Sequence, residues 1–149
     1  YRHAHVKEGV LGTALYSRYP LEHLATKWLA PNTYATLFAT VAVNGREIRL
    51  VNVHAPPPTR AAYYETRNAV LRTLPAELAG APDVIVAGDL NITPWSPVYR
   101  GLVARAGLDD ARLGQGIHGT WPQAAGPLAI PIDHVLTRGA LESVRFRSV

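Results

Sequence analysis

The sequence predicts one α/β domain, a sandwich of mixed strands and helices. Three observations support this class: an Asn-Gly pair between two β-rich runs, a helical repeat over 59–78, and a short apolar run at 83–88. The two strands of a hairpin pair antiparallel, whereas strands connected through a helix commonly pair in parallel. We therefore expect a mixed sheet rather than a simple parallel one.

Strands are expected in three segments of the first half. Residues 10–16 (VLGTALY) form an apolar run that ends at SRYP, where Pro20 excludes helical geometry for its neighbour. The runs 34–43 and 47–54 flank an Asn-Gly pair, whose residues tolerate the positive φ of a two-residue hairpin turn. The pattern predicts a strand with an exit turn, followed by a β-hairpin.

A helix and a buried strand follow the hairpin. Apolar residues over 59–78 fall near a 3.6-residue period, with Thr59 placed to cap the helix and Gly80 to end it. The continuous apolar run 83–88 (DVIVAG) is typical of a strand buried on both faces.

The last third is predicted to hold a short helix, an irregular stretch and two strands. The helix covers 96–106, with Ser96 as its cap and Pro97 at its first position. The irregular stretch runs from 107 to 126. Two final strands are expected around an Arg-Gly turn, at 129–137 and 141–146.

Composition excludes several classes of protein. The chain has 149 residues with 48% hydrophobic and 17% charged residues, which suits one globular domain. It has no cysteine, so disulfide scaffolds, cysteine zinc sites and thiol nucleophiles are excluded. No apolar run approaches the ~20 residues of a membrane span, and the first residues lack a signal-peptide core.

Polar residues follow the buried strand in the segment Gly-Asp-Leu-Asn. In extended geometry Asp89 and Asn91 point to one side while Leu90 points to the other. Two polar groups therefore converge where the strand leaves the core. The alternative is an Asx-turn that begins the loop toward Thr93.

A second polar pair ends the hairpin. Asn52 and His54 share one face of their strand. The alternative for His54 is an ordinary structural or exposed histidine.

Asp133 stands within the apolar segment PIDHVL, where we expect it to be shielded from water and to need a partner. That partner is Arg138 or a loop backbone in one alternative, and a catalytic histidine in the other.

Five segments, in order, resemble the endonuclease/exonuclease/phosphatase superfamily: GVLGTALYSRYPL, VNVHAPPP, GDLNITPWSP, GTWP and PIDHVL. This superfamily includes deoxyribonuclease I, abasic endonucleases of the exonuclease III type, neutral sphingomyelinases and inositol phosphatases. The resemblance covers about residues 7–147 and implies a four-layer α/β/β/α sandwich. TPWSP and TWP look most like a bacterial branch that is often membrane-anchored and includes teicoplanin-resistance-type proteins.

The resemblance implies roles for five residues, and a sixth, Asn52, is selected because it shares a strand face with His54. Asp89 matches the residue that orients or deprotonates the attacking water, and Asn91 matches the amide that holds a phosphoryl oxygen. His54 matches a phosphate-contacting histidine, and Asp133 the aspartate that supports the catalytic histidine. Arg18 matches a phosphate-contacting arginine in a variable loop, and Asn52 is assigned to substrate binding.

The implied cofactor is Mg²⁺, with Mn²⁺ as a substitute, held by Asp89 and Asn91. The family pattern also has an upstream Asn and Glu and a terminal Ser-Asp-His, which these 149 residues do not contain. Glu8 is too close to SRYP to be that Glu, and His134 points away from the face of Asp133. We therefore expect residues 1–149 to be the central and C-terminal portion of one domain, inactive alone and active in its parent.

The resemblance thus implies a Mg-dependent phosphoester hydrolase, a phosphodiesterase or a phosphatase, acting on a nucleic-acid, lipid or small-molecule phosphate. The alternative is a non-catalytic module that only packs or binds phosphate weakly. The net charge of +4 allows nucleic acid, but the basic residues form no stripe. We also expect self-association through an incomplete sheet. Localisation is open, and the branch suggests a membrane-anchored, extracytoplasmic parent.

Overall fold

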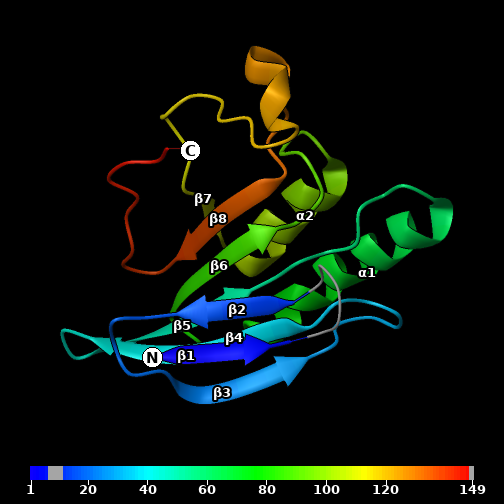
Figure 1. Cartoon of the computed structure of the whole chain (residues 1–149). Helices are drawn as coiled ribbons and strands as arrows, with labels where there is room; N and C mark the ends of the chain where they lie inside the picture. The colour runs from blue at the N-terminus through cyan, green and yellow to red at the C-terminus, as the bar shows by residue number, and fades with distance from the viewer. Residues whose placement is uncertain (7–11, 148–149) are drawn as a thin grey trace.

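The computed structural model describes residues 1–6 and 12–147, which form two sheets and two long helices (Figure 1). Lys7, Glu8 and the first two residues of the predicted strand 10–16 lie outside the described residues. The elements in chain order are β1 (Arg2–His5), β2 (Thr13–Tyr16), β3 (Glu22–Lys27), β4 (Thr36–Val43), β5 (Arg46–Asn52), α1 (Ala61–Glu77), β6 (Asp83–Asp89), α2 (Pro97–Ala106), β7 (Asp109–Asp110), a 3₁₀ helix (Gln123–Leu128) and β8 (Asp133–Arg138).

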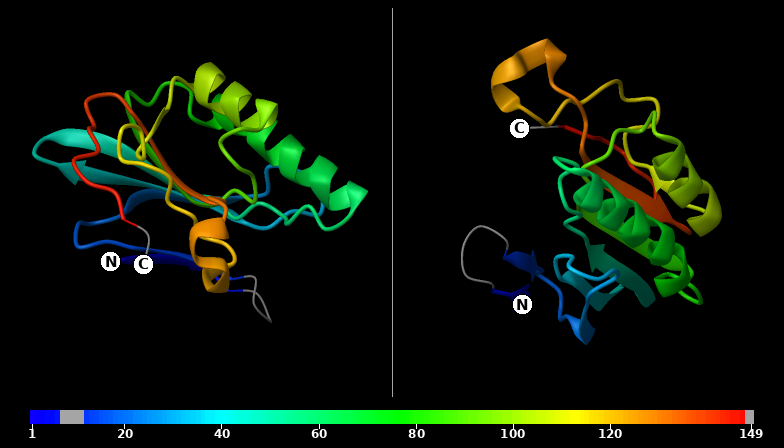
Figure 2. Two further views of the ribbon diagram at one scale, coloured as in Figure 1. Left: turned by 90° about the horizontal axis from the view of Figure 1, so that it is seen from above. Right: turned by 90° about the vertical axis from the view of Figure 1, so that its right-hand side faces the viewer.

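The main sheet has six strands in the order β3-β4-β5-β6-β8-β7. Strands β5 and β6 pair in parallel and the other neighbours are antiparallel, so the predicted mixed sheet is confirmed. Helices α1 and α2 cover one face, and the small β1–β2 sheet lies against β4 and β5 on the other (Figure 2). These layers match part of the predicted α/β/β/α sandwich.

Local signals fix the hairpin and α2 as predicted. Asn44 and Gly45 both have positive φ, at 50° and 77°, between the paired strands β4 and β5. Ser96 caps α2 because its side chain accepts a hydrogen bond from the Val98 amide, and Pro97 takes the first helical position. Each of these features is set by two or three adjacent residues.

The core lies between the helices and the main sheet. Apolar side chains one helical turn apart on α1 pack against alternate residues of the central strands. One apolar face of the helix and one face of the sheet therefore form a common core. Full burial of each such aliphatic side chain contributes about 1.5–3 kcal/mol. The cluster includes Leu71, Leu74 and Leu78 of α1, Tyr99 and Leu102 of α2, and Val51, Val84, Val86 and Leu136 of the sheet.

Three predictions about elements are wrong. Thr59 does not cap α1; Arg60 takes that position without a side-chain bond, and the Thr59 amide donates to the Pro57 carbonyl. Strand β8 begins at Asp133 rather than at 129, because Pro131 has no N–H to donate. Residues 141–146 form no strand; the Ser143 hydroxyl donates to Ala111 O and the Phe146 amide to Gln115 Oε1.

Three strands were not predicted, and one of them, the two-residue β7, lies in the stretch 107–126 that was expected to be irregular. Strands β1 (RHAH) and β3 (EHLATK) carry few large apolar residues, since each lies at a sheet edge and needs little burial. None of the helices in the described parts of the chain combines the length and apolar character that crossing a bilayer requires.

Candidate active site

The parallel strands β5 and β6 end at the same edge of the sheet and hold the candidate residues there (Figure 1). Their ladder continues past the strand ends: the Val53 amide donates to Ala87 O at 3.0 Å, and the Ala55 amide donates to Asp89 O at 2.9 Å. Backbone hydrogen bonding thereby fixes His54 beside the turn that follows β6.

Gly88 allows this close approach. A Cβ built on Gly88 would lie 2.0 Å from the carbonyl oxygen of Val53, and its φ is +136°. No L-residue with a side chain fits that space or that conformation. The glycine of Gly-Asp-Leu-Asn is therefore a requirement of the backbone geometry.

An Asx-turn orders the residues after β6, as the alternative from sequence proposed. The Asn91 amide donates to Asp89 Oδ1 at 2.7 Å, and Asn91 has a φ of +49°. Its side-chain Nδ2 donates to Ala55 O at 2.8 Å. Leu90 points into the core and its amide bonds Ile132 O. The turn fixes both polar side chains on the side away from Leu90.

A cavity of about 580 Å³ opens beside this turn, and His54, Asp89 and Asn91 all line it. The His54 ring packs edge-on against Tyr34, with 4.8 Å between ring centroids. The other lining residues are Pro57, Pro58, Thr59, Arg67, Ile92, Thr93, Ser96, Trp121, Ile130 and Ile132.

Asp89 is partly buried, and burial raises the pKa of its carboxyl above the ordinary value. The negative charge of Asp133 raises the pKa further. The hydrogen bond from the Asn91 amide and the nearby His54 both lower it. The environment thus moves this carboxylate toward the basicity that suits proton transfer near neutral pH.

Arg67 is a lining residue that we did not predict from the sequence. It is only 6% exposed, and its Nη1 donates to Asn91 O at 2.8 Å. Its Nε and Nη2 donate to Asn68 Oδ1, and its guanidinium stacks on the Tyr64 ring. None of the ion pairs among the described residues involves Arg67, so this buried cation has no carboxylate against it.

The signal for Arg67 was present in the sequence. It precedes Leu71, Leu74 and Leu78 on the apolar stripe of α1, one helical turn before Leu71. A charged residue on a core-facing stripe is rare unless it is paired or contacts a ligand.

Asp133 is exposed, so the prediction that it is shielded from water is wrong. Side chains alternate along β8: Ile132, His134 and Leu136 are buried, which leaves Asp133 on the opposite face. Arg138 is not its partner, because that guanidinium donates to the carbonyls of Ala106, Leu78 and Ala81. Asp133 pairs in register with Asp89 across β6 and β8.

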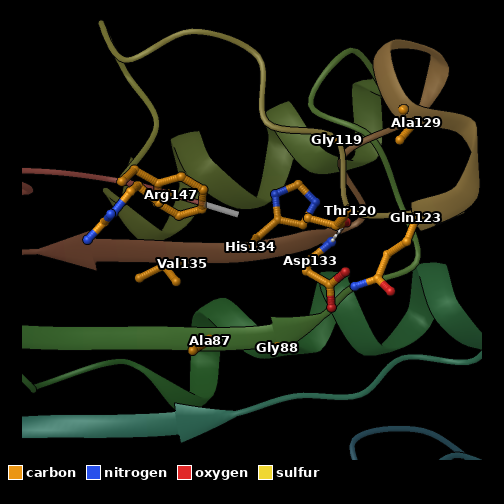
Figure 3. Close-up of a pocket in the computed structure, with 12 residues that line it drawn as sticks. Ala87, Gly88, Gly119, Thr120, Gln123, Ala129, Asp133, His134, Val135 and Arg147 are labelled. Carbon is orange, nitrogen blue, oxygen red and sulfur yellow. Dashed lines mark hydrogen bonds between the residues drawn. The ribbon is translucent and has the colours of Figure 1, made fainter. Parts of the chain in front are cut away.

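Asp133 lies at a second cavity of about 720 Å³, on the face of β6 and β8 away from the helices. Figure 3 shows the Gln123 side chain pointing toward Asp133, with Gly88 and Ala87 on the neighbouring strand. The Asp133 amide donates to Thr120 Oγ1 at 3.2 Å. Asp89, the last residue of β6, and Asp133, the first residue of β8, therefore each line a cavity.

His134 faces away from Asp133, as predicted, and belongs to a buried cluster formed with Tyr99, Asp110 and Arg112. His134 Nε2 donates to the Ile92 carbonyl at 2.7 Å, and Nδ1 accepts from Arg112 at 2.6 Å. Arg112 also bonds both oxygens of Asp110, to which the Tyr99 hydroxyl donates. Only Nη1 of Arg112 lacks a partner among the described residues of this cluster.

Two predicted substrate-binding residues lie apart from the cavity lining. Arg18 is exposed in the turn after β2. Asn52 Nδ2 donates to Ala14 O at 2.9 Å, which ties the main sheet to the β1–β2 sheet. Asn52 thus has a structural contact, and the cavity lining includes neither residue.

The oxygen donors present suit a hard cation. Asp89 and Asn91 offer carboxylate and amide oxygens, and Mg²⁺ commonly takes one or two carboxylates with water and substrate phosphate completing its shell. Within residues 1–6 and 12–147 no three His, Cys, Asp or Glu side chains gather into a complete metal-binding group. The donor set therefore fits a cation shared with a substrate.

Comparison with known proteins agrees with the fold. The family model described as "Endonuclease/Exonuclease/phosphatase family" matches residues 1–149. A humanised D. rerio TDP2 is 22% identical with a TM-score of 0.69, and the alignment covers 94% of this chain and 61% of the TDP2 chain. The Neisseria 3′ phosphatase NExo was solved bound to a product DNA hairpin. It is 18% identical with a TM-score of 0.69, and the alignment covers 94% of this chain and 67% of the NExo chain.

A third solved structure, the endonuclease/exonuclease/phosphatase from Beutenbergia cavernae DSM 12333, is 22% identical with a TM-score of 0.72, covering 87% of this chain and 40% of its own. The chain thus spans about 61% of the TDP2 chain and 40% of the Beutenbergia chain. No match was found among curated proteins. The matches identify no branch, so the teicoplanin-resistance resemblance stays a prediction.

Proposed function

Because the chain belongs to the endonuclease/exonuclease/phosphatase family, we propose that it carries part of the active site of a Mg-dependent phosphoester hydrolase. Family membership and the TDP2 and NExo neighbours support hydrolysis of a phosphoester. The observation that carries the assignment is that His54, Asp89 and Asn91 line one cavity at the ends of two parallel strands.

Each residue type answers a requirement of phosphoester hydrolysis. The substrate is an anion that repels hydroxide, so the water needs a positioned base and the phosphoryl oxygens need donors. Asp89, with its raised pKa, is the proposed base for the water. His54 is the proposed donor to phosphate, and Asn91 lies beside it on the same cavity lining.

Arg67 supports the same assignment through its charge. A buried guanidinium with no carboxylate partner favours an anion in the cavity that it lines. Asp89 and Asn91 are the residues that would hold Mg²⁺, or Mn²⁺ in its place. When bound, that ion would neutralise phosphoryl charge and lower the pKa of a coordinated water.

The test is hydrolysis of bis(p-nitrophenyl) phosphate and p-nitrophenyl phosphate with and without Mg²⁺, by this chain and by any longer protein that contains it. We expect Asp89→Asn to lower Mg-dependent turnover by a factor on the order of 10³. Asp109→Asn is the matched control, because it removes an exposed carboxylate on β7 outside the cavity lining. Retained turnover in Asp89→Asn would overturn the proposal.

A non-catalytic module is the competing outcome. In that case neither the chain nor a longer protein would hydrolyse either ester, while inorganic phosphate would still bind at the cavity and Arg67→Met would weaken that binding. Duplex DNA and a DNA hairpin belong in the same assay, since NExo was solved with a product DNA hairpin.

A further inference from the structure

The cavity beside Asp89 has two chemically different ends. Toward β5, β6 and α1 it is lined by His54, Asp89, Asn91 and Arg67. Toward the segment before β8 it is lined by Trp121, Ile130 and Ile132, with Pro57 and Pro58 also contributing apolar surface. A phosphate has five covalently bonded non-hydrogen atoms and fills less than the roughly 150 Å³ that five waters of about 30 Å³ would take. The 580 Å³ cavity therefore has room for a larger group attached to it.

Two large residues of the apolar end are exposed. Trp121 is 57% exposed and Ile130 38% exposed. The two residues face each other across an isolated antiparallel bridge. Exposed large apolar side chains that line a cavity together with polar residues are typical of a binding surface.

The backbone at this end is already hydrogen-bonded. The Trp121 amide donates to Ile130 O at 3.1 Å, and the Ile130 amide donates to Trp121 O at 2.7 Å. Thr120 Oγ1 accepts from the amides of Ile132 and Asp133. The Ser96 hydroxyl, also on the lining, accepts from the Val98 amide. The wall therefore offers a ligand mostly carbon surface.

This chemistry discriminates between substrates. A nucleobase whose polar edge this wall covers would leave ring nitrogens and exocyclic groups without partners, and each such group costs about 1–3 kcal/mol. An alkyl group leaves no polar atom unpaired, and each buried methylene contributes about 0.8 kcal/mol, or roughly fourfold in affinity.

We propose that the cavity takes a phosphate ester whose other group is an alkyl chain, with the phosphate beside His54 and Arg67 and the chain against Trp121 and Ile130. The phosphate end rests on the proposed function. The alkyl end is a separate assignment, carried by the exposed aromatic and aliphatic pair.

The test is isothermal titration calorimetry of the chain in Mg²⁺ with methyl phosphate, octyl phosphate below its aggregation concentration, 1-octanol, and 2′-deoxyadenosine 5′-monophosphate. We expect octyl phosphate to bind at least about tenfold more tightly than methyl phosphate, equivalent to burial of two or more methylenes. We expect 1-octanol and the nucleotide to bind more weakly than octyl phosphate.

Trp121→Ala should reduce the octyl-to-methyl ratio to less than about threefold, with methyl phosphate affinity unchanged. Trp28→Ala is the matched control, because Trp28 is 56% exposed and lies outside the cavity lining. Ile130→Ser tests the same wall with an independent change, so the result does not depend on one variant.

The outcomes separate the two proposals. If no phosphate ligand binds, the proposed function fails, and this inference fails with it. If methyl phosphate binds and octyl phosphate binds no more tightly, only the alkyl assignment is overturned. Equal binding of 1-octanol, or tighter Trp121-dependent binding of the nucleotide, also overturns the alkyl assignment; the latter would indicate base stacking.

Discussion

Two polar clusters, one buried and one beside the cavity at Asp89, each contain a histidine, an aspartate and an arginine but balance their charges differently. In the buried cluster of Tyr99, Asp110, Arg112 and His134, both ring nitrogens of His134 and both oxygens of Asp110 have partners. Burial also keeps His134 neutral, since it lowers the pKa of the imidazole to about 4.

The cavity residues differ in their charge balance. Asp89 receives the Asn91 amide on one oxygen, and burial together with the charge of Asp133 raises the pKa of its carboxyl. Arg67 is buried without a carboxylate partner. The difference teaches that a histidine and an aspartate near a strand end are insufficient to mark a site. A buried cation without a carboxylate beside it, in a cavity that other polar side chains line, is the stronger indication.

The largest expected effect on stability comes from breaking the buried cluster. Arg112→Met leaves Asp110 buried without its cation, and we expect the free energy of unfolding to fall by about 3–5 kcal/mol. Urea denaturation measures it. Lys27→Met is the control, because it breaks the more exposed Lys27–Glu77 pair and should cost less than about 1 kcal/mol. Equal losses in the two variants would show that the cluster has no special structural role.

A pH dependence of stability should follow from His134. The imidazole pKa is about 6.5 in an unfolded chain and about 4 in the folded one, so the unfolded chain binds the extra proton between these values. The free energy of unfolding should therefore fall as the pH is lowered from about 6.5 to 4, by about 3 kcal/mol in total. Denaturation at several pH values measures the slope. His134→Gln should flatten it, and an unchanged slope in that variant would contradict the assignment.

A smaller effect is expected at Asp133, which faces the open cavity instead of the buried cluster. In a longer active protein, Asp133→Asn should lower turnover by a factor on the order of 10², about 2.7 kcal/mol in activation free energy, with substrate binding nearly unchanged. Steady-state kinetics separates the two effects. Wild-type turnover under saturating Mg²⁺ would leave Asp133 with a structural role only.

Features determined by adjacent residues were predictable. The Asn44-Gly45 turn, the Ser96 cap and the apolar strand before Asp89 each depend on a few neighbouring side chains, and the structure has all three. Strands β1 and β3 could not be predicted in this way, because polar edge strands are stabilised by pairing with distant segments.

The candidate site shows the same division. Successive side chains of a strand point to opposite faces. This pattern correctly predicted that Asp89 and Leu90 point to different sides, and likewise Asp133 and His134. The exposure of Asp133 could not be derived from its apolar neighbours, because it depends on what covers the second face of β8. Arg67 acts on Asn91 across 24 residues of sequence, and only the packing of α1 brings them together.

The most direct measurement of the central claim is an NMR titration of the ¹⁵N-labelled chain with inorganic phosphate in the presence of Mg²⁺. If the cavity at the ends of β5 and β6 is the phosphoryl site, the amide signals of Ala55, Asp89 and Asn91 will shift, and Asp89→Asn will weaken the response. The amides of Arg112 and His134 should stay unchanged. Shifts confined to those two residues, or no shift around Asn91 at saturating phosphate, would contradict it.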